Sequence, residues 1–205
     1  MDNIYAILGI TAGVLSLVGY IPYIISILRG KTLPNKASWI IWSVVGGLIA
    51  FSYLAEGDKN TIWLPLGYFL GPLITALISL RYGYSVWSRL DKICLVAAMI
   101  SIIPWLLFKD GTYTLIINVL IDSTGAIPTL VKTYREPDTE DISAWSIFLI
   151  ANTIQVLAIS DWNLTATYPV YLFLLATAMV VLIMKNKLNL FRRGIYCVIR
   201  LKTYW

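Results

Sequence analysis

The sequence contains no histidine and few charged residues of either sign. Charged side chains make up 13% of its 205 residues, whereas soluble domains carry about 25%. Cys-x-x-Cys pairs, a phosphate-binding loop and a nucleophile with a neighbouring base are also missing. The two cysteines, Cys94 and Cys197, are too few for a disulfide framework. We therefore expect no enzyme, no metal site and no cofactor.

Apolar residues are abundant instead. They make up 59% of the chain, and the mean hydropathy is +0.76. Several apolar runs are long enough to span a bilayer, which needs about 20 residues per helix. The sequence therefore predicts an all-α membrane protein with seven transmembrane helices, over residues 4–28, 38–55, 61–80, 93–109, 112–134, 143–160 and 167–185.

The distribution of positive charge predicts the topology. From the first loop to the C-terminal tail, the connecting segments hold 3, 1, 3, 1, 2, 0 and 6 Lys or Arg residues, so alternate segments hold 14 of the 16. The positive-inside rule then places the N-terminus outside and the C-terminus in the cytoplasm, in the plasma (inner) membrane for a prokaryotic protein. The start, Met1-Asp2-Asn3, lacks the basic segment of a cleavable signal peptide. Because topology explains the net charge of +5, we expect no nucleic-acid partner.

An internal repeat appears at an offset of 106 positions. Residues 19–22 (GYIP) align with residues 125–128 (GAIP), and the same offset aligns Arg29 with Arg135 and Trp39 with Trp145. A gap-free match of these residue types is much rarer by chance than a match of Ile or Leu. We interpret helices one to three as repeated in helices five to seven, with the fourth as a connector. An odd connector gives both units the same orientation, a parallel repeat.

This plan resembles the SWEET and PQ-loop transporter superfamily, over residues 4–185. In addition, residues 120–125 (LIDSTG) resemble the Asp-x-Thr-Gly segment of the cystinosin branch, which implies that Asp122 is the proton-coupling residue. Nicotinamide riboside carriers share the 3+1+3 plan and are a possible relative. The chain departs from the family pattern at two kinds of position. The family has a glutamine after the proline of the first helix of each unit, and the sugar carriers have an asparagine after the proline of the third. Because this chain has neither, sugar is disfavoured as the solute. These positions are Tyr23 and Thr129 for glutamine, and Leu66 and Val170 for asparagine.

The predicted domains follow from the repeat. They are a first triple-helix unit (1–80), a connector (81–110), a second triple-helix unit (111–185) and a basic cytoplasmic tail (186–205). The tail alternates basic and apolar residues, so we expect a helix lying on anionic lipid, although a partner contact would also fit. The acidic segment 136–141 (EPDTED) is interpreted as a solvated cytoplasmic turn.

Asp122 is the only charged residue from Thr112 to Val131. Its burial in a bilayer costs on the order of 3 kcal/mol, so we expect it to face a protein interior or a water-filled cavity. Burial favours the neutral acid and water the carboxylate, so alternating access would load and release a proton. A structural acid hydrogen-bonded to neighbouring hydroxyl or amide groups is the alternative.

Other polar residues share helical stripes with Asp122 or with its repeat equivalent. On the fifth helix the stripe holds Asn118, Gly125 and Thr129, and on the first it holds Ala12, Ser16, Gly19 and Tyr23. The sixth helix adds Trp145, Phe148, Asn152 and Gln155. The predicted solute-binding residues are Asn118, Asn152, Gln155, Ser16, Tyr23 and Thr129. Interhelical hydrogen bonding is the alternative role for these polar groups.

Two further pairs are related by the repeat. Pro22 and Pro128 each remove a backbone donor and kink their helix, so they are candidate hinges of a cytoplasmic gate, although static kinks are equally compatible. Trp39 and Trp145 lie near helix starts at the predicted interface, where we expect them to act as membrane anchors.

These observations predict a transporter that moves a small polar solute by alternating access, coupled to protons through Asp122. An uncoupled facilitator of the sugar or vitamin type is an alternative, and a non-transporting seven-helix receptor or assembly factor is another. The expected partners are the solute, protons and membrane lipids.

Overall fold

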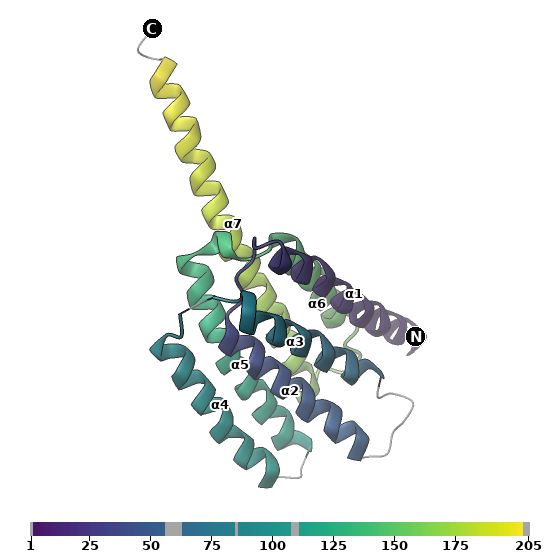
Figure 1. Ribbon diagram of the computed structural model, residues 1–205. Coiled ribbons are helices and arrows are strands. Elements are labelled where there is room, and N and C mark those ends of the chain that lie inside the picture. The colour runs from purple at the N-terminus through teal and green to yellow at the C-terminus, as the bar shows by residue number, and fades with distance from the viewer. Residues whose placement is uncertain (1, 56–62, 85, 108–110, 203–205) are drawn as a thin grey trace.

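The computed structural model describes the backbone of residues 2–55, 63–84, 86–107 and 111–202 and is all-helical in these segments (Figure 1). The described elements include seven α-helices and two short 3-10 turns. The helices are α1 (Asp2–Leu28), α2 (Lys36–Ala55), α3 (Trp63–Tyr82), α4 (Arg89–Leu107), α5 (Gly111–Arg135), α6 (Ile142–Leu157) and α7 (Thr167–Lys202), and the turns are η1 (Pro137–Thr139) and η2 (Leu164–Ala166).

The helix bounds agree with the predicted ones to within a few residues, except at two ends. α4 begins at Arg89 rather than 93, because Ser88 and Asp91 cap it reciprocally: the Asp91 amide donates to Ser88 Oγ (3.0 Å) and the Ser88 amide to Asp91 Oδ2 (2.7 Å). α7 does not end near 185 but continues unbroken to Lys202 and projects from the bundle (Figure 1). The predicted start of the third helix at 61, the end of the fourth at 109 and residues 203–205 of the tail lie outside the described residues.

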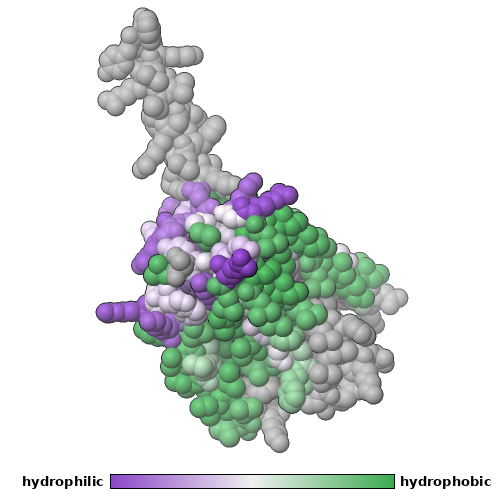
Figure 2. All heavy atoms as spheres, viewed as in Figure 1, coloured by the Kyte–Doolittle hydropathy of each residue, from purple (hydrophilic) through white to green (hydrophobic). Residues whose placement is uncertain are grey.

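Three helical segments of the described chain are long and apolar enough to cross a membrane: Ile4–Leu28, Leu115–Arg135 and Thr167–Lys185. One side of α1 leaves an unbroken row of large apolar residues exposed. Its members are Ile4, Ile7, Ile10, Val14, Leu17, Val18, Ile21, Ile25 and Leu28. Figure 2 shows broad apolar surface over the bundle and polar residues gathered at the end from which α7 projects. Such extensive apolar exposure is what a bilayer, not water, accommodates.

The helices of the two predicted units pack in equivalent pairs. α3 packs against both α1 and α2, and α7 packs against both α5 and α6. Between the units, α1 packs along α6 and α5 along α2, while α4 lies against α5 (Figure 1). In the repeat α1 corresponds to α5 and α6 corresponds to α2. The α1–α6 pair and the α5–α2 pair are therefore equivalent.

Two close contacts between the units are equivalent in the same way. A Cβ atom added at Gly19 would lie 2.6 Å from the ring of Phe148, and one at Gly125 would lie 3.1 Å from Nε1 of Trp42. The two glycines are 106 positions apart, and so are the two aromatic residues. In both cases the isoleucine that precedes the aromatic residue also lies against the glycine. Each unit therefore receives an aromatic side chain of the other on a glycine, where helices approach closely.

The second helix of each unit starts with an equivalent cap. Asn35 Oδ1 accepts the backbone amide of Ser38 (3.1 Å), and Asp141 Oδ1 accepts that of Ala144 (2.8 Å). Both are side-chain N-caps of the usual kind. The cap residues are again 106 positions apart.

The end of the bundle formed by residues 29–35, 83–84, 86–88 and 136–141 is called the basic end below. Its connecting segments are joined by backbone hydrogen bonds, from the Leu33 amide to the Thr139 carbonyl and from the Tyr84 amide to the Pro34 carbonyl (both 2.9 Å). The Tyr84 hydroxyl also donates to Glu136, and this bond raises the pKa of the phenol above its ordinary value of 10.0. Asn35 donates to Asp91 Oδ1 (2.9 Å), which ties the start of α2 to that of α4.

Candidate functional site

Asp122 lies in the middle of α5, with 4% of its surface exposed. Both oxygens of its carboxyl group face phenols of α7. The Tyr171 hydroxyl donates to Oδ2 at 2.6 Å, and the Tyr168 hydroxyl donates to Oδ1 at 3.2 Å. The prediction that Asp122 faces the protein interior is confirmed.

Neither tyrosine was among the predicted site residues. Tyr168 and Tyr171 are three positions apart and so lie on one face of α7. A tyrosine in an apolar helix gives little signal by itself, because it is compatible with packing and with interfacial positions. Their relation to Asp122 depends on how α7 packs against α5, which no local pattern specifies.

Trp42 joins the site from the other predicted unit. Its Nε1 group donates to the backbone carbonyl of Asp122 at 3.2 Å. This bond connects α2 to α5, so Asp122 lies where the first and second units meet. Tyr20 of α1 also interacts electrostatically with the carboxyl group.

Asn118 lies one turn from Asp122 on the same face of α5 and is 7% exposed. Its Oδ1 atom is buried and has no hydrogen-bond partner among the described residues. Buried polar atoms are usually paired, so an unpaired one is a candidate contact for a solute or a water molecule. Solute binding by Asn118 stays a prediction, and the unpaired oxygen makes it the candidate to test beside Asp122.

Thr129 and Ser16 are buried as well, with exposed fractions of 0% and 7%. Thr129 Oγ1 has no hydrogen-bond partner among the described atoms, but it lies about two turns from Asp122 towards the basic end. Asn152 and Gln155 are partly buried on α6, whereas the hydrogen bonds described for the Asp122 carboxyl group come from α7. Solute binding by these four residues stays a prediction.

Tyr23 lies in a second polar cluster, at the basic end. It is fully buried, and its hydroxyl donates to Glu140 Oε2 at 2.9 Å. Trp145 Nε1 donates to the same oxygen at 2.9 Å, and Lys132 forms an ion pair with Oε1 at 2.5 Å. Glu140, Lys132, Tyr23 and Trp145 are called the Glu140 cluster below.

The Glu140 cluster joins the two units. Tyr23 comes from α1, whereas Glu140, Lys132 and Trp145 come from the second unit. Lys132 Nζ also donates to the backbone carbonyl of Leu33 at 2.5 Å, in the α1–α2 connection. Together with the bond from Leu33 to Thr139, these contacts close the basic end across the boundary between the units.

Two sequence-based interpretations are wrong at this cluster. The segment 136–141 is not a fully solvated turn, because Glu140 is 6% exposed and paired with Lys132. Trp39 and Trp145 are not interfacial anchors, because they are 2% and 4% exposed. Other aromatic side chains pack on both indoles: the ring centroids of Trp39 and Tyr23 are 5.0 Å apart, and those of Trp145 and Phe148 are 5.6 Å apart.

Pro22 and Pro128 lie inside α1 and α5, which both continue past them. Pro128 is buried and Pro22 partly so. Each proline directly precedes a buried residue of the predicted stripes, Tyr23 or Thr129. Their role as hinges stays a prediction.

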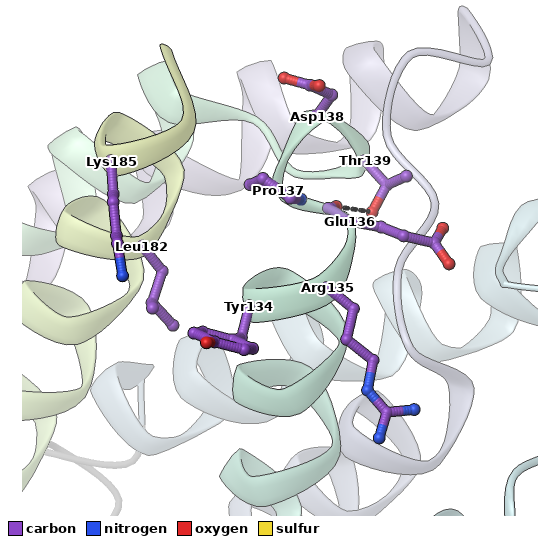
Figure 3. Close-up of a pocket in the computed structure, with 8 residues that line it drawn as sticks. All are labelled: Tyr134, Arg135, Glu136, Pro137, Asp138, Thr139, Leu182 and Lys185. Atoms are coloured by element: carbon purple, nitrogen blue, oxygen red, sulfur yellow. Dashed lines mark hydrogen bonds between the residues drawn. The ribbon is translucent and has the colours of Figure 1, made fainter. Parts of the chain in front are cut away.

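A surface pocket of about 560 Å³ lies at the basic end, between the end of α5, η1 and α7 (Figure 3). Its lining residues are Tyr134, Arg135, Glu136, Pro137, Asp138, Thr139, Leu182 and Lys185. Tyr134 is 12 residues from Asp122, or about 18 Å along the helix. Because charges of both signs line it and no predicted site residue does, we do not assign the solute to this pocket.

Comparison with known proteins finds no matching family model, no matching curated protein and no matching solved structure.

Proposed function

We propose that this protein is a multi-pass membrane transporter of the SWEET and PQ-loop type, which moves a small polar solute by alternating access and couples it to protons through Asp122. All seven helices cross the membrane in this proposal, with the N-terminus outside and the basic end in the cytoplasm.

The membrane location is supported by the apolar surface of α1 and by the three helices of spanning length. The topology is supported by the position of the cations. Lys36, Arg81, Arg89, Lys92 and Lys132 all lie within the first or last four residues of their helices at the basic end. This is the pattern that the positive-inside rule gives for a cytoplasmic surface.

The observation that carries the function is the buried carboxyl group of Asp122. Ionisable residues inside a membrane are costly and typically mark ion pathways or proton relays. The nearest basic residue on α5 is Lys132, ten positions and about 15 Å away, and the groups that contact the carboxyl group are neutral phenols. An acid without a cation as its partner can alternate between its neutral and charged forms when its access to water changes.

Alternating access is supported by the way the two units meet. The exchanged contacts at Gly19 and Gly125 relate the units by an approximate two-fold arrangement, in which one unit can rock against the other. The Glu140 cluster closes the cytoplasmic end in this conformation. Opening that end requires Tyr23 to separate from Glu140 and Lys132 to leave the Leu33 carbonyl.

The unpaired amide oxygen of Asn118 favours a polar solute over an apolar one. Its unpaired Oδ1 atom lies one turn from Asp122, where a hydrogen-bond donor of the solute would satisfy it. A thermal-shift screen of the purified protein against amino acids, sugars and vitamins would identify the solute. A ligand at 100 times its Kd stabilises a protein by about 2.7 kcal/mol.

The test of coupling is uptake of the identified solute into proteoliposomes, with and without an imposed pH gradient. Asp122→Asn has nearly the same volume but cannot release a proton. We expect this variant to lose accumulation driven by the gradient and to keep solute exchange, which needs no net proton movement. Asp161→Asn makes the same chemical change at an exposed position and serves as the matched control.

Each outcome decides between the alternatives. Gradient-driven accumulation by the Asp122 variant would show that the acid is structural. Exchange and accumulation that are insensitive to pH in the wild type would indicate an uncoupled facilitator. If no solute of the screen binds or is taken up by the wild type, a receptor or assembly role replaces transport.

A further inference from the structure

The two phenols around Asp122 match the hydrogen-bonding needs of its ionised form. A carboxylate only accepts hydrogen bonds, whereas a carboxylic acid must also donate one. Tyr171 and Tyr168 each direct a hydroxyl to a different oxygen of the carboxyl group. With both phenols donating, each oxygen accepts a hydrogen bond, and neither hydroxyl group is oriented to accept one from a proton on Asp122.

Protonation of Asp122 therefore weakens these two bonds, because their acceptor loses its charge. A phenol can donate or accept, so a tyrosine that rotates its O–H bond away can accept a hydrogen bond from the neutral acid. The buried Oδ1 atom of Asn118, one turn away, is a second acceptor without a partner among the described residues. Hydrogen bonds to a charged acceptor are stronger than those to a neutral one. The pair of phenols thus favours the ionised acid, and loss of either phenol favours proton uptake.

The other helices packed against α5 offer no competing charge near Asp122. α2 contributes the indole of Trp42. α4 has its charged residues, Arg89, Asp91 and Lys92, in its first turn at the basic end. On α7 the first basic residue is Lys185, 14 positions from Tyr171.

The helices of the first unit that face this region are equally free of cations at this depth. The sequence of α1 holds no Lys or Arg, and α3 has only Arg81, at its basic end. Tyr20 of α1 interacts electrostatically with the carboxyl group, and it is a third phenol. Neutral phenols, and not cations, therefore surround the ionised form of Asp122 in the described part of the chain.

We propose that Tyr171 and Tyr168 are positioning residues that stabilise the carboxylate of Asp122 and so set the pH at which it binds a proton. Tyr171 has the larger effect, because its hydrogen bond is 2.6 Å long and that of Tyr168 is 3.2 Å. The consequence for transport rests on the proposed function, whereas the effect on Asp122 itself does not.

The experiment is an infrared pH titration of the purified full-length protein. The C=O band of a protonated carboxyl group is assigned to Asp122 by its loss in Asp122→Asn, and its intensity is followed against pH in each variant. Tyr171→Phe is expected to move the midpoint to higher pH by about one unit, a tenfold change in proton binding, because a charge-assisted hydrogen bond is lost. Tyr168→Phe is expected to move it in the same direction by less.

Tyr134→Phe is the matched control, because this phenol lies on α5, the helix of Asp122, but is 67% exposed. We expect no change of midpoint in this variant. A midpoint in Tyr171→Phe equal to that of the wild type overturns the proposal. If that variant does not fold, the same result in Tyr168→Phe overturns it.

Uptake measurements on the same proteins separate this proposal from the proposed function. A shifted infrared midpoint in a protein that moves no solute supports the role of the phenols and refutes transport. An unshifted midpoint in a protein with pH-driven uptake refutes the role of the phenols and leaves transport standing. If the role of the phenols and the transport function are both correct, the pH of half-maximal uptake shifts together with the infrared midpoint in each variant.

Discussion

Replacing Lys132 by methionine removes a buried ammonium group and leaves the side chain of Glu140 without its charge partner. The side chains of the pair are 4% and 0% exposed and lie 2.5 Å apart. Breaking a buried ion pair from one side typically costs about 3–5 kcal/mol, because a buried charge is left uncompensated. Glu140 keeps two neutral donors, Tyr23 and Trp145, so we expect a loss near the lower end of that range, about 3 kcal/mol.

The assay is an equilibrium unfolding titration of the purified protein in mixed micelles, with helicity as the signal. The double variant Lys132→Met/Glu140→Gln removes both charges. It is expected to be more stable than the sum of the two single variants indicates, with a coupling energy of about 1–3 kcal/mol. Lys31→Met makes the same change at an exposed position and is expected to leave the midpoint unchanged.

Two results would refute this reasoning. A loss below about 1 kcal/mol in Lys132→Met is the value of a solvated pair, and it would mean that water reaches Glu140 in the folded protein. Additive single variants would mean that the two side chains do not interact.

The remaining predictions concern topology and motion. A reporter fused after Trp205 is expected in the cytoplasm and one inserted at Gly57 outside; finding both on the same side would refute the seven-span arrangement. Pro22→Ala and Pro128→Ala are expected to leave the fold intact but to slow the exchange between inward- and outward-open states, measured as cysteine accessibility and transport rate. Unchanged accessibility and unchanged rates in both variants would show that the kinks are static.

The sequence predicts the helices well because their signal is local. Apolar length, caps such as Asp141 and turn residues specify where most of the seven helices begin and end. Helical periodicity also predicts that Asn118, Asp122 and Thr129 share a buried face, and all three are buried.

The contacts between helices could not be predicted in this way. Glu140 lies in an acidic segment and Lys132 in the last turn of a helix, where solvent exposure is the usual expectation. The pair is covered by Tyr23 of α1, by Trp145 of α6 and by the α1–α2 connection, whose Leu33 carbonyl accepts from Lys132. The same holds for Tyr168 and Tyr171, whose role depends on which face of α7 meets α5. A sequence search for polar groups favours amides and acids in apolar helices and therefore overlooks phenols, which also pack as aromatic residues.

The contact between Gly19 and Phe148 has a consequence for biosynthesis. The two residues are 129 positions apart, so at about 5–20 residues per second the ribosome adds Phe148 roughly 6–26 s after Gly19. During that interval α1 can pack against α3 but not against α6, and the glycine face that later receives Phe148 meets lipid or the insertion machinery. The reciprocal contact forms in the opposite order, because Trp42 is already in place when Gly125 emerges. The first half of the nascent chain therefore cannot complete its packing until α6 has been synthesised. A chain that stops before α6 leaves α1 without the helix along which it packs.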